Sequence, residues 1–337
     1  TYDLAPFMQA GRNVLAATVW NLGPGAAIAQ MSDRIGFLLH GHGTEESAAD
    51  TGEQWDVERE TAIRTQRPDL EGYYAAEPGM RMDGGAFDWQ WDRDNDAGAD
   101  WKKAVPLGAG ALRGATDPPT NWQLVSDPLP AMDMKLVPPG KVVRASGLDT
   151  PVDFPSAALT VAAHTKASIL IDNGALTTGY PALTAGGSGA SIRLTYSEAL
   201  VDEDGHKGNR NDVDGRHIAG VVDEFVPGRE SHEFMPLSWR TWRYLQIDVE
   251  AGENPVSIEG FQTWFSAFPF VEQGYFSSDD ASLKPIWDIG WRTARLDAHD
   301  TYMDTPYWER LQYVGDTRIQ ALISYAVAGD DRLARQA

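Results

Sequence analysis

Two runs decide the fold class: Tyr244-Leu-Gln-Ile-Asp-Val249 and Val256-Ser-Ile-Glu-Gly-Phe-Gln-Thr263. Both are short and rich in Val, Ile, Leu, Tyr and Thr, a composition that is typical of β-strands. Similar runs occur through the first 270 residues, and the clearest are Asn13–Trp20, Ile35–His40, Ser168–Ile171 and Ser191–Tyr196. Turn residues separate the runs, as at Pro118-Pro119, Pro138-Pro139-Gly140 and Gly186-Gly187-Ser188-Gly189. Many short strands between such turns predict β-sandwiches rather than βαβ units.

The pattern becomes helical after Phe276. Ser277 and Asp280 have the spacing of a capping box, which predicts the start of a helix. Apolar positions then recur at helical intervals, at Ile286, Ile289, Thr293 and Leu296. Asp316–Val327 predicts a second helix that ends at Gly329. Its expected apolar side consists of Ile319, Leu322, Ile323 and Ala326.

The chain of 337 residues is expected to contain several domains, because one domain has roughly 100–200 residues. Asp117–Gly147 is rich in Pro and lacks periodicity, which places a boundary near residue 140. The expected order is an N-terminal β-sandwich with its linker (1–140), a second β-sandwich (141–275) and the start of a helical domain (276–337). Two helices cannot bury their apolar faces alone, and the chain opens at Thr1 without a basic or apolar segment from which a targeting signal can be read. Both ends are therefore expected to be cut, with the start of the first domain and the remainder of the last one missing.

Charge and composition exclude several functions. The chain has 28 Lys and Arg against 49 Asp and Glu, a net charge of −21, which repels nucleic acid and anionic membrane surfaces. No apolar run approaches the roughly 18 residues of a membrane helix. Without Cys, the chain has no disulfide, thiolate metal site or cysteine nucleophile. This composition is compatible with a secreted and with a cytoplasmic protein, and the sequence specifies no oligomeric state.

The segment with most chemistry is Asp304-Thr-Pro-Tyr-Trp-Glu309-Arg-Leu-Gln-Tyr313-Val-Gly-Asp316. It places three carboxylates among aromatic residues, just before a predicted helix. Neighbouring carboxylates and apolar walls raise the pKa of an acid, as glycoside hydrolysis requires of the group that protonates the leaving oxygen. The residues alone also allow a structural interpretation, in which Asp316 stabilises a helix N-terminus and Glu309-Arg310 is solvated surface.

The order of residues in this segment resembles the α-L-rhamnosidases of glycoside hydrolase family 78. The signature of that family is Asp-x-Pro-x-x-Glu-(Arg/Lys)-x-x-aromatic-x-Gly-Asp, at the start of an (α/α)6 barrel. The matching positions are Asp304, Pro306, Glu309, Arg310, Tyr313, Gly315 and Asp316. Phe234–Tyr244 and Lys207–Asp212 are similar to the β-domain that precedes the barrel, and Asn121–Leu124 and Tyr2-Asp3 fit the N-terminal sandwich. The likeness covers nearly the whole chain and implies β-sandwich domains followed by the first helices of a truncated (α/α)6 barrel.

The resemblance implies a role for each matching residue. Glu309 is expected to be the general acid that protonates the glycosidic oxygen. Asp304 and Asp316 are expected to bind rhamnose hydroxyls and to tune Glu309, with Tyr313 as a sugar platform. Arg310 and Trp308 complete the expected substrate-binding set; Trp308 stands where many members carry Arg, and Tyr313 where Trp is common.

The implied reaction is the inverting hydrolysis of terminal α-L-rhamnose from a plant glycoside or polysaccharide, which needs no organic cofactor. The family's general-base glutamate lies in later barrel helices, outside this chain. Residues 1–337 alone are therefore expected to be inactive.

Other constellations are weaker. Asp92-Arg-Asp94-Asn-Asp96-Ala-Gly98 approaches a calcium loop, but its Gly is one place late and position 12 is Lys103, which favours a solvated acidic turn. Asp202–His206 is interpreted as a hairpin turn. His40 and His42 lack a third ligand at suitable spacing, so no metal site is predicted.

Two alternative functions remain open at this point. One is a carbohydrate-binding β-sandwich protein without catalysis, whose sugar binding would survive deletion of Phe276–Ala337. The other is an (α/α)6 glycosidase for a different sugar, since related enzymes share acid-bearing loops.

Overall fold

The computed structural model describes residues 2–29, 35–68, 70, 72–93, 100–116, 123–148 and 153–337. The chain divides into two compact units. The first consists of Thr1–Asn21, Met31–Thr61 and Asp88–Pro128, and the second of Leu22–Gln30, Ala62–Phe87 and Leu129–Ala337. Residues 62–87 thus join the unit that holds the C-terminal half. The domain boundaries expected at residues 140 and 275 stay a prediction.

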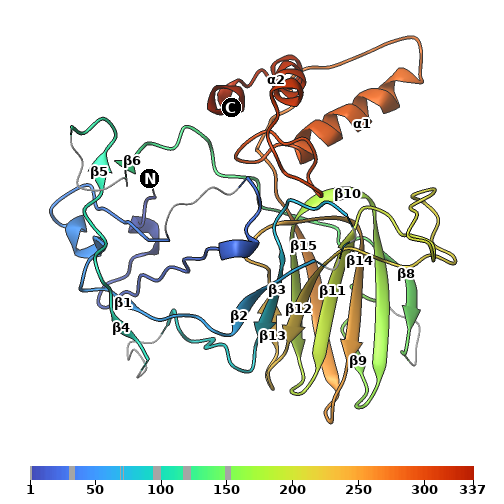
Figure 1. Cartoon of the computed structure of the whole chain (residues 1–337), viewed down its shortest axis with the longest axis horizontal. Helices are drawn as coiled ribbons and strands as arrows, with labels where there is room; N and C mark the ends of the chain where they lie inside the picture. Colours follow the sequence, from blue (N-terminus) through green and yellow to red (C-terminus); the bar gives the residue numbers. More distant parts are fainter. Residues whose placement is uncertain are drawn as a thin grey trace. The chain divides into compact units, whose positions relative to one another are not determined.

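An eleven-stranded sheet dominates the second unit (Figure 1). Its main path has the order β2-β3-β12-β11-β14-β10-β15-β7, and β8, β9 and β13 pair beside it. The strands are β2 (Ile63–Gln66), β3 (Gly79–Asp83), β7 (Lys135–Val137), β8 (Lys141–Ser146), β9 (Leu159–Val161), β10 (Lys166–Gly186), β11 (Ser191–Ser197), β12 (Val221–Val226), β13 (His232–Phe234), β14 (Arg240–Glu250) and β15 (Val256–Phe265).

Strand β10 has 21 residues and belongs to both layers of a β-sandwich. Its first part, 166–172, pairs with β8 and β14, whereas 179–186 pairs with β15 and 183–185 also with β13. The register with β14 shifts between Asp172 and Thr177, and the pairing with β14 then continues to Gly179, where pairing with β15 begins. The core is formed by alternating buried side chains, including Ile192, Leu194 and Tyr196 on β11 opposite Val249, Ile247 and Leu245 on β14.

These pairings confirm the predicted strands Ser168–Ile171, Ser191–Tyr196, Tyr244–Val249 and Val256–Thr263. Burial alternates over Leu245–Val249 on β14, whereas Ile169, Leu170 and Ile171 on β10 are all buried, so both faces of that strand are covered.

The N-terminal strand predictions are wrong. Asn13–Trp20 and Ile35–His40 form no strand, and Val14, Leu15, Ile35 and Phe37 are 43% to 52% exposed. A β-favouring composition yields a strand only where a partner strand and a packed face are available. The described residues of this unit form two short pairs, β1 (Asp56–Val57) with β4 (Lys102–Lys103) and β5 (Ala111–Leu112) with β6 (Gln123–Leu124), and these make no sandwich.

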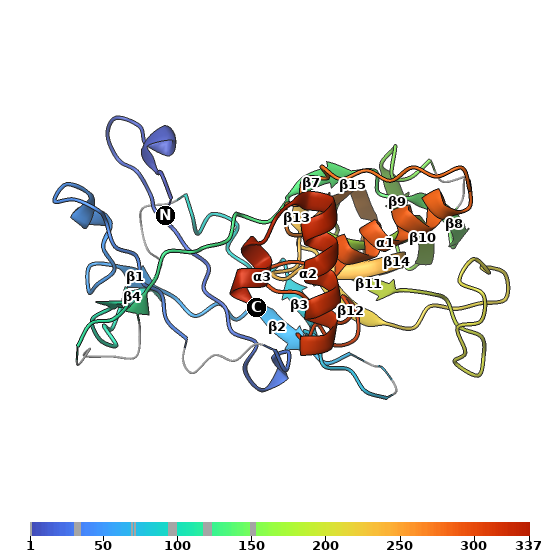
Figure 2. The same ribbon diagram turned by 90° about the horizontal axis from the view of Figure 1, so that it is seen from above.

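Helices α1 (Leu283–Leu296), α2 (Val314–Ala328) and α3 (Arg332–Gln336) lie at one end of the sandwich (Figures 1 and 2). Both predicted helices and the stop at Gly329, which has φ 63°, are confirmed. The predicted capping box is wrong: α1 begins after Ser282, whose backbone N–H donates to Asp280. In the described part of the chain, no helix has the length and hydropathy needed to cross a membrane.

The expected apolar faces of the helices are not the buried ones. Ile286, Ile289, Ile319 and Leu322 are 54% to 64% exposed. Helix α2 instead buries the side that carries Ala321, Ser324, Val327 and Ala328, and its alanines share a cluster with Phe268, Phe270 and Tyr302. Periodicity identifies a helix, but the side that is covered depends on which segments pack against it. The (α/α)6 barrel stays a prediction.

Candidate functional site

The loop between α1 and α2 carries the predicted acids and is attached to the end of the sandwich. The Tyr307 hydroxyl donates to the carbonyl of Tyr196 (2.8 Å) and accepts from the N–H of Val221 (3.2 Å). The Thr241 hydroxyl donates to the carbonyl of Pro306 (2.7 Å). The loop therefore rests on β11, β12 and β14 through buried hydrogen bonds.

Close packing at this attachment requires a glycine. A Cβ on Gly220 would lie 1.8 Å from the carbonyl oxygen of Tyr196 and 2.7 Å from the Tyr307 hydroxyl. On the other side of the loop, the N–H of Ala75 donates to the carbonyl of Trp308 (2.9 Å). Residues 62–87, which the sequence assigns to another domain, thus contact the acid-bearing loop.

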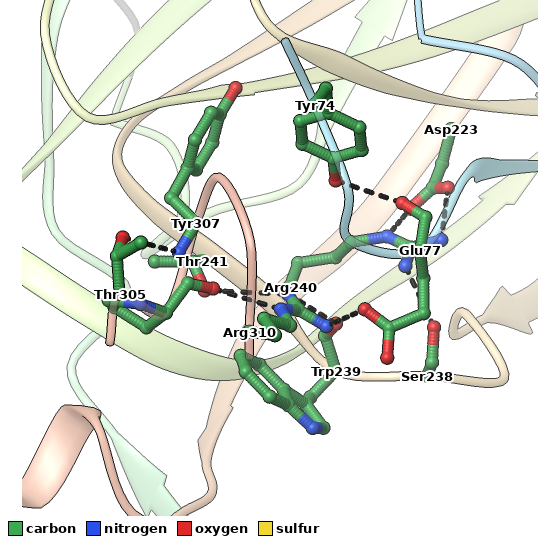
Figure 3. A network of polar contacts seen from close by, with 11 residues as sticks. Tyr74, Glu77, Asp223, Ser238, Trp239, Arg240, Thr241, Thr305, Tyr307 and Arg310 are labelled. Atoms are coloured by element: carbon green, nitrogen blue, oxygen red, sulfur yellow. Dashed lines mark hydrogen bonds and ion pairs between the residues drawn. The ribbon is translucent and has the colours of Figure 1, made fainter. Parts of the chain in front are cut away.

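Arg310 is the buried centre of the attachment (Figure 3). Its guanidinium forms an ion pair with Glu77 and donates to the carbonyls of Pro306 (2.9 Å) and Trp239 (3.3 Å). It also lies 3.3 Å from the centroid of the Trp239 ring, as a cation–π contact. All these partners belong to the protein, so they hold the loop in place. The expected contact of Arg310 with substrate stays a prediction.

A second buried ion pair, Arg240–Asp223, lies in the sandwich beneath the loop. Arg240 on β14 donates to both carboxylate oxygens of Asp223 on β12, at 2.7 and 2.9 Å (Figure 3). The Tyr196 hydroxyl and the N–H of Met80 donate to the same carboxylate, at 2.8 and 2.7 Å. The buried charge of Asp223 is therefore compensated by an arginine and two further donors, as a buried charge must be.

Asp304 closes the acid-bearing loop. Its backbone N–H donates to the carbonyl of Leu311 (2.8 Å), and its carboxylate accepts from the N–H of Leu311 (3.0 Å). Burial raises the pKa of the Asp304 carboxyl, the backbone donors Leu311 and Thr305 oppose the rise, and the charge of Glu309 adds to it. The structure thus brings Asp304 and Glu309 close enough to interact electrostatically.

Glu309 and Tyr313 are paired at the surface of this loop. The Tyr313 hydroxyl donates to the Glu309 carboxylate (2.8 Å), and Tyr313 is 44% exposed. This hydrogen bond, with smaller contributions from partial burial and from the Glu309 charge, raises the pKa of Tyr313 to about 12. The phenol therefore remains a neutral donor to Glu309 at neutral pH, with its ring accessible to a ligand.

Trp308 faces a different group, which sequence reasoning missed. Its indole N–H donates to the buried carboxylate of Glu198 (2.9 Å), and the same carboxylate oxygen accepts from Lys207 (2.9 Å). The Lys207 ammonium lies 4.8 Å from the Trp308 ring centroid. Trp308 is half-buried, so part of the ring remains available.

Asp316 lies in the first turn of α2 and is exposed. Its charge, together with those of Asp304 and Glu198, acts on a further acid, Asp297 at the C-terminal end of α1. Burial and these three carboxylates raise the pKa of Asp297 to about 8, so that it is protonated at neutral pH. The sequence offers no periodic or motif signal for Asp297.

The other groups of acids and histidines noted in the sequence lie outside the acid-bearing loop. Asp202, Asp204 and His206 approach one another at the surface, but Arg216 already contacts Asp202 (3.2 Å). The proposed calcium turn falls mostly on 94–99, outside the described residues. His40 contacts Asp50 (3.3 Å) rather than a second histidine.

The sequence matches no protein-family model and no curated protein. Among solved structures, the α-L-rhamnosidase from Dictyoglumus thermophilum matches with a TM-score of 0.54 and 18% identity, over 82% of this chain and 27% of that one. A rhamnosidase from Klebsiella oxytoca with rhamnose bound gives 0.49 and 19%, over 62% and 44%. The GH78 family rhamnosidase of Bacillus sp. GL1 gives 0.46 and 26%, over 56% and 19%.

The chain therefore spans less than half the length of each of these structures. At 18% identity, the match to the Dictyoglumus thermophilum enzyme is evidence of a shared fold. The fold shared with that enzyme extends over 82% of this chain. The structural resemblance predicted from Asp304–Asp316 is confirmed: in its fold, the chain is similar to part of an α-L-rhamnosidase.

Proposed function

We propose that the protein containing this chain is an inverting α-L-rhamnosidase, which releases terminal α-L-rhamnose from a plant glycoside or polysaccharide. Glu309 is the general acid. Asp304 and Asp316 bind sugar hydroxyls, and the exposed ring of Tyr313 is a platform for the apolar face of the sugar. Trp308 lies beside Glu198 and completes the sugar-facing surface.

One observation carries this proposal: Glu309 is partly exposed on a loop whose neighbouring residues are fixed in the protein. Pro306, Tyr307 and Arg310 make buried contacts with the sandwich. A catalytic acid must be held within a few tenths of an ångström of its productive position while its carboxyl remains accessible. The loop provides both conditions at Glu309.

The proposed reaction needs a proton donor and a base. Glu309 would give its proton to the leaving oxygen as the bond to the anomeric carbon breaks, and the developing oxocarbenium charge would be stabilised by nearby carboxylates. Inversion requires a second carboxyl about 6.5–9.5 Å away to activate water. By the resemblance, that base belongs to barrel helices outside these 337 residues, and no residue described above is assigned to it.

The test is hydrolysis of a panel of aryl glycosides by the protein containing this chain. Selective cleavage of the α-L-rhamnoside is expected, with the β-anomer of rhamnose as the first product in NMR. Glu309→Gln should lower kcat by about 100-fold or more, because general acid catalysis contributes about that much. Glu272→Gln, at an exposed position after the sandwich, is the matched control and should leave kcat unchanged.

Three outcomes would contradict parts of the proposal. Near-normal turnover by Glu309→Gln would exclude Glu309 as the acid. Cleavage of a glucoside or fucoside but not of the rhamnoside would favour a different sugar. A folded protein that cleaves no glycoside, yet binds sugar without Phe276–Ala337, would favour the non-catalytic alternative.

A further inference from the structure

Asp297 is a buried acid that the proposed reaction has not used. It lies at the C-terminal end of α1 and is 6% exposed. Its Oδ1 atom has no hydrogen-bond partner among the described residues. Buried polar atoms in native proteins are nearly always paired, so an unpartnered carboxyl oxygen requires an explanation.

The backbone around Met303 brings Asp297 to the acid-bearing loop. The N–H of Met303 donates to the carbonyl of Asp297 (2.8 Å), and the next residue is Asp304. The Gln320 side chain donates to the carbonyl of Met303 (2.6 Å). Gln320 lies one helical turn after Asp316 on α2, on the same side of the helix. Hydrogen bonds to Met303 therefore connect the end of α1, the acid-bearing loop and the first half of α2, the three segments that carry Asp297, Asp304 and Asp316.

The charges around Asp297 are all negative. Asp304, Asp316 and Glu198 are the charged groups that act on it, and together with burial they raise its pKa to about 8. The basic groups of the surrounding segments pair with other acids: Arg295 with Asp133, Lys207 with Glu198, and Arg310 with Glu77. His299, two residues further on, is neutral because burial and the Arg310 charge lower its pKa to about 3.

We propose that Asp297 is a positioning residue of the site, which carries a proton beside Asp304 and Asp316 so that these two carboxylates can face the same sugar. This inference rests on the proposed function of Asp304 and Asp316. Like charges that share a site repel one another, so one of several neighbouring carboxylates tends to stay protonated. The protonated group is the one with the least access to water, because burial disfavours the charged form, and here that group is Asp297. When Asp297 loses its proton, the added charge repels Asp304 and Asp316 and disturbs their placement.

The proton can be observed directly in the 337-residue chain. In a titration of chain labelled with ¹³C at the aspartate carboxyls, one resonance should have a midpoint near pH 8. It should be absent from Asp297→Asn and present in Asp300→Asn, a control at an exposed position of the same loop. The proposal is overturned if every aspartate titrates below pH 6, or if the late resonance persists in Asp297→Asn.

The pH dependence of activity distinguishes positioning from simple structural support. In the wild-type protein containing this chain, ionisation of Asp297 should add a loss of kcat/KM on an aryl rhamnoside above pH 8, of up to about tenfold per pH unit beyond the loss that the general acid causes. In Asp297→Asn this added loss should be absent, while Asp300→Asn should follow the wild type. An equal loss at every pH in Asp297→Asn would show a structural role and overturn the proposal. If the wild type cleaves no glycoside, the proposed function fails. The ¹³C titration still tests whether Asp297 is protonated at neutral pH, because it does not depend on activity.

Discussion

Arg310 has an unusual backbone conformation for its residue type. Its φ is 57°, in the left-handed region, where a side chain costs about 1–2 kcal/mol relative to glycine. The ion pair with Glu77 and the contact with Trp239 provide the compensating interactions. This conformation reverses the chain direction directly after Glu309, so the buried arginine determines where the acid is placed.

We expect the Arg310–Glu77 pair to be essential for stability. Arg310→Met removes the guanidinium that faces a buried carboxylate, which should lower the free energy of unfolding by about 3–5 kcal/mol. Urea denaturation followed by tryptophan fluorescence measures the loss. Lys166→Met is the control, because its partner Glu250 is 63% exposed and exposed pairs contribute at most about 1 kcal/mol.

A double variant checks the cause of this effect. Glu77→Gln combined with Arg310→Met should regain part of the stability, since the uncompensated charge is gone. If Arg310→Met is as stable as the wild type, the pair does not hold the loop.

The sequence could predict only the local part of the site. Asp304, Glu309 and Tyr313 fall within ten residues, so one loop brings them together and their spacing reveals them. Glu77 is 233 residues from Arg310 and Glu198 is 110 residues from Trp308, so these contacts arise from the tertiary fold. No local pattern marks such partners.

At the scale of elements, a glycine inside a helix lowers its stability, whereas a glycine directly after a helix stabilises its end. Gly290 lies within α1, and a Cβ there would meet nothing within 4 Å. Gly329 follows α2 with φ 63°, and its N–H donates to the carbonyl of Tyr325 (3.2 Å). The first position has an ordinary helical backbone, whereas the second needs the freedom of glycine.

We therefore predict opposite results for two identical substitutions. Gly290→Ala should stabilise the chain by about 0.5–1 kcal/mol, and Gly329→Ala should destabilise it by about 1 kcal/mol. Thermal unfolding followed by circular dichroism compares both with the wild type. Equal shifts of Tm in the same direction would contradict the assignment of Gly329 as the stop of α2.

Element type was easier to predict than element surroundings. Composition identified four strands of the sandwich, within β10, β11, β14 and β15, because these runs are rich in β-favouring residues. Asn13–Trp20 has a similar composition but no partner strand, and Gly79–Asp83, which pairs in parallel with β12, has no strong signal of its own. The exposed positions of Ile286 and Ile319 show the same limit for helices.

At the scale of the whole molecule, two buried groups determine part of the pH dependence of stability. The pKa of Asp297 rises from 3.8 to about 8 on folding, so the folded state retains a proton that the unfolded state releases between these values. Stability therefore falls as the pH rises from 4 to 8. The pKa of His299 falls from 6.5 to about 3, so the unfolded state takes up a proton in that range and stability falls as the pH drops. Between pH 4 and 6.5 the two effects cancel.

We predict that single variants reveal the two slopes. Relative to the wild type, Asp297→Asn should gain stability steadily from pH 4 to 8, by at most about 1.4 kcal/mol per pH unit. His299→Phe, which can keep the stacking on Trp239, should gain stability relative to the wild type as the pH falls from 6.5 to 3. Urea denaturation across this pH range provides the measurement, and differences that do not change with pH would contradict both assignments.

The long strand β10 has a consequence for how the molecule unfolds. Because one continuous backbone runs through both layers, neither layer can open without disrupting pairing in the other. The loop with Glu309 is attached to β11, β12 and β14 of the same framework. Unfolding of the sandwich and loss of the site should therefore be a single cooperative event, with the acid kept in place until the whole framework melts.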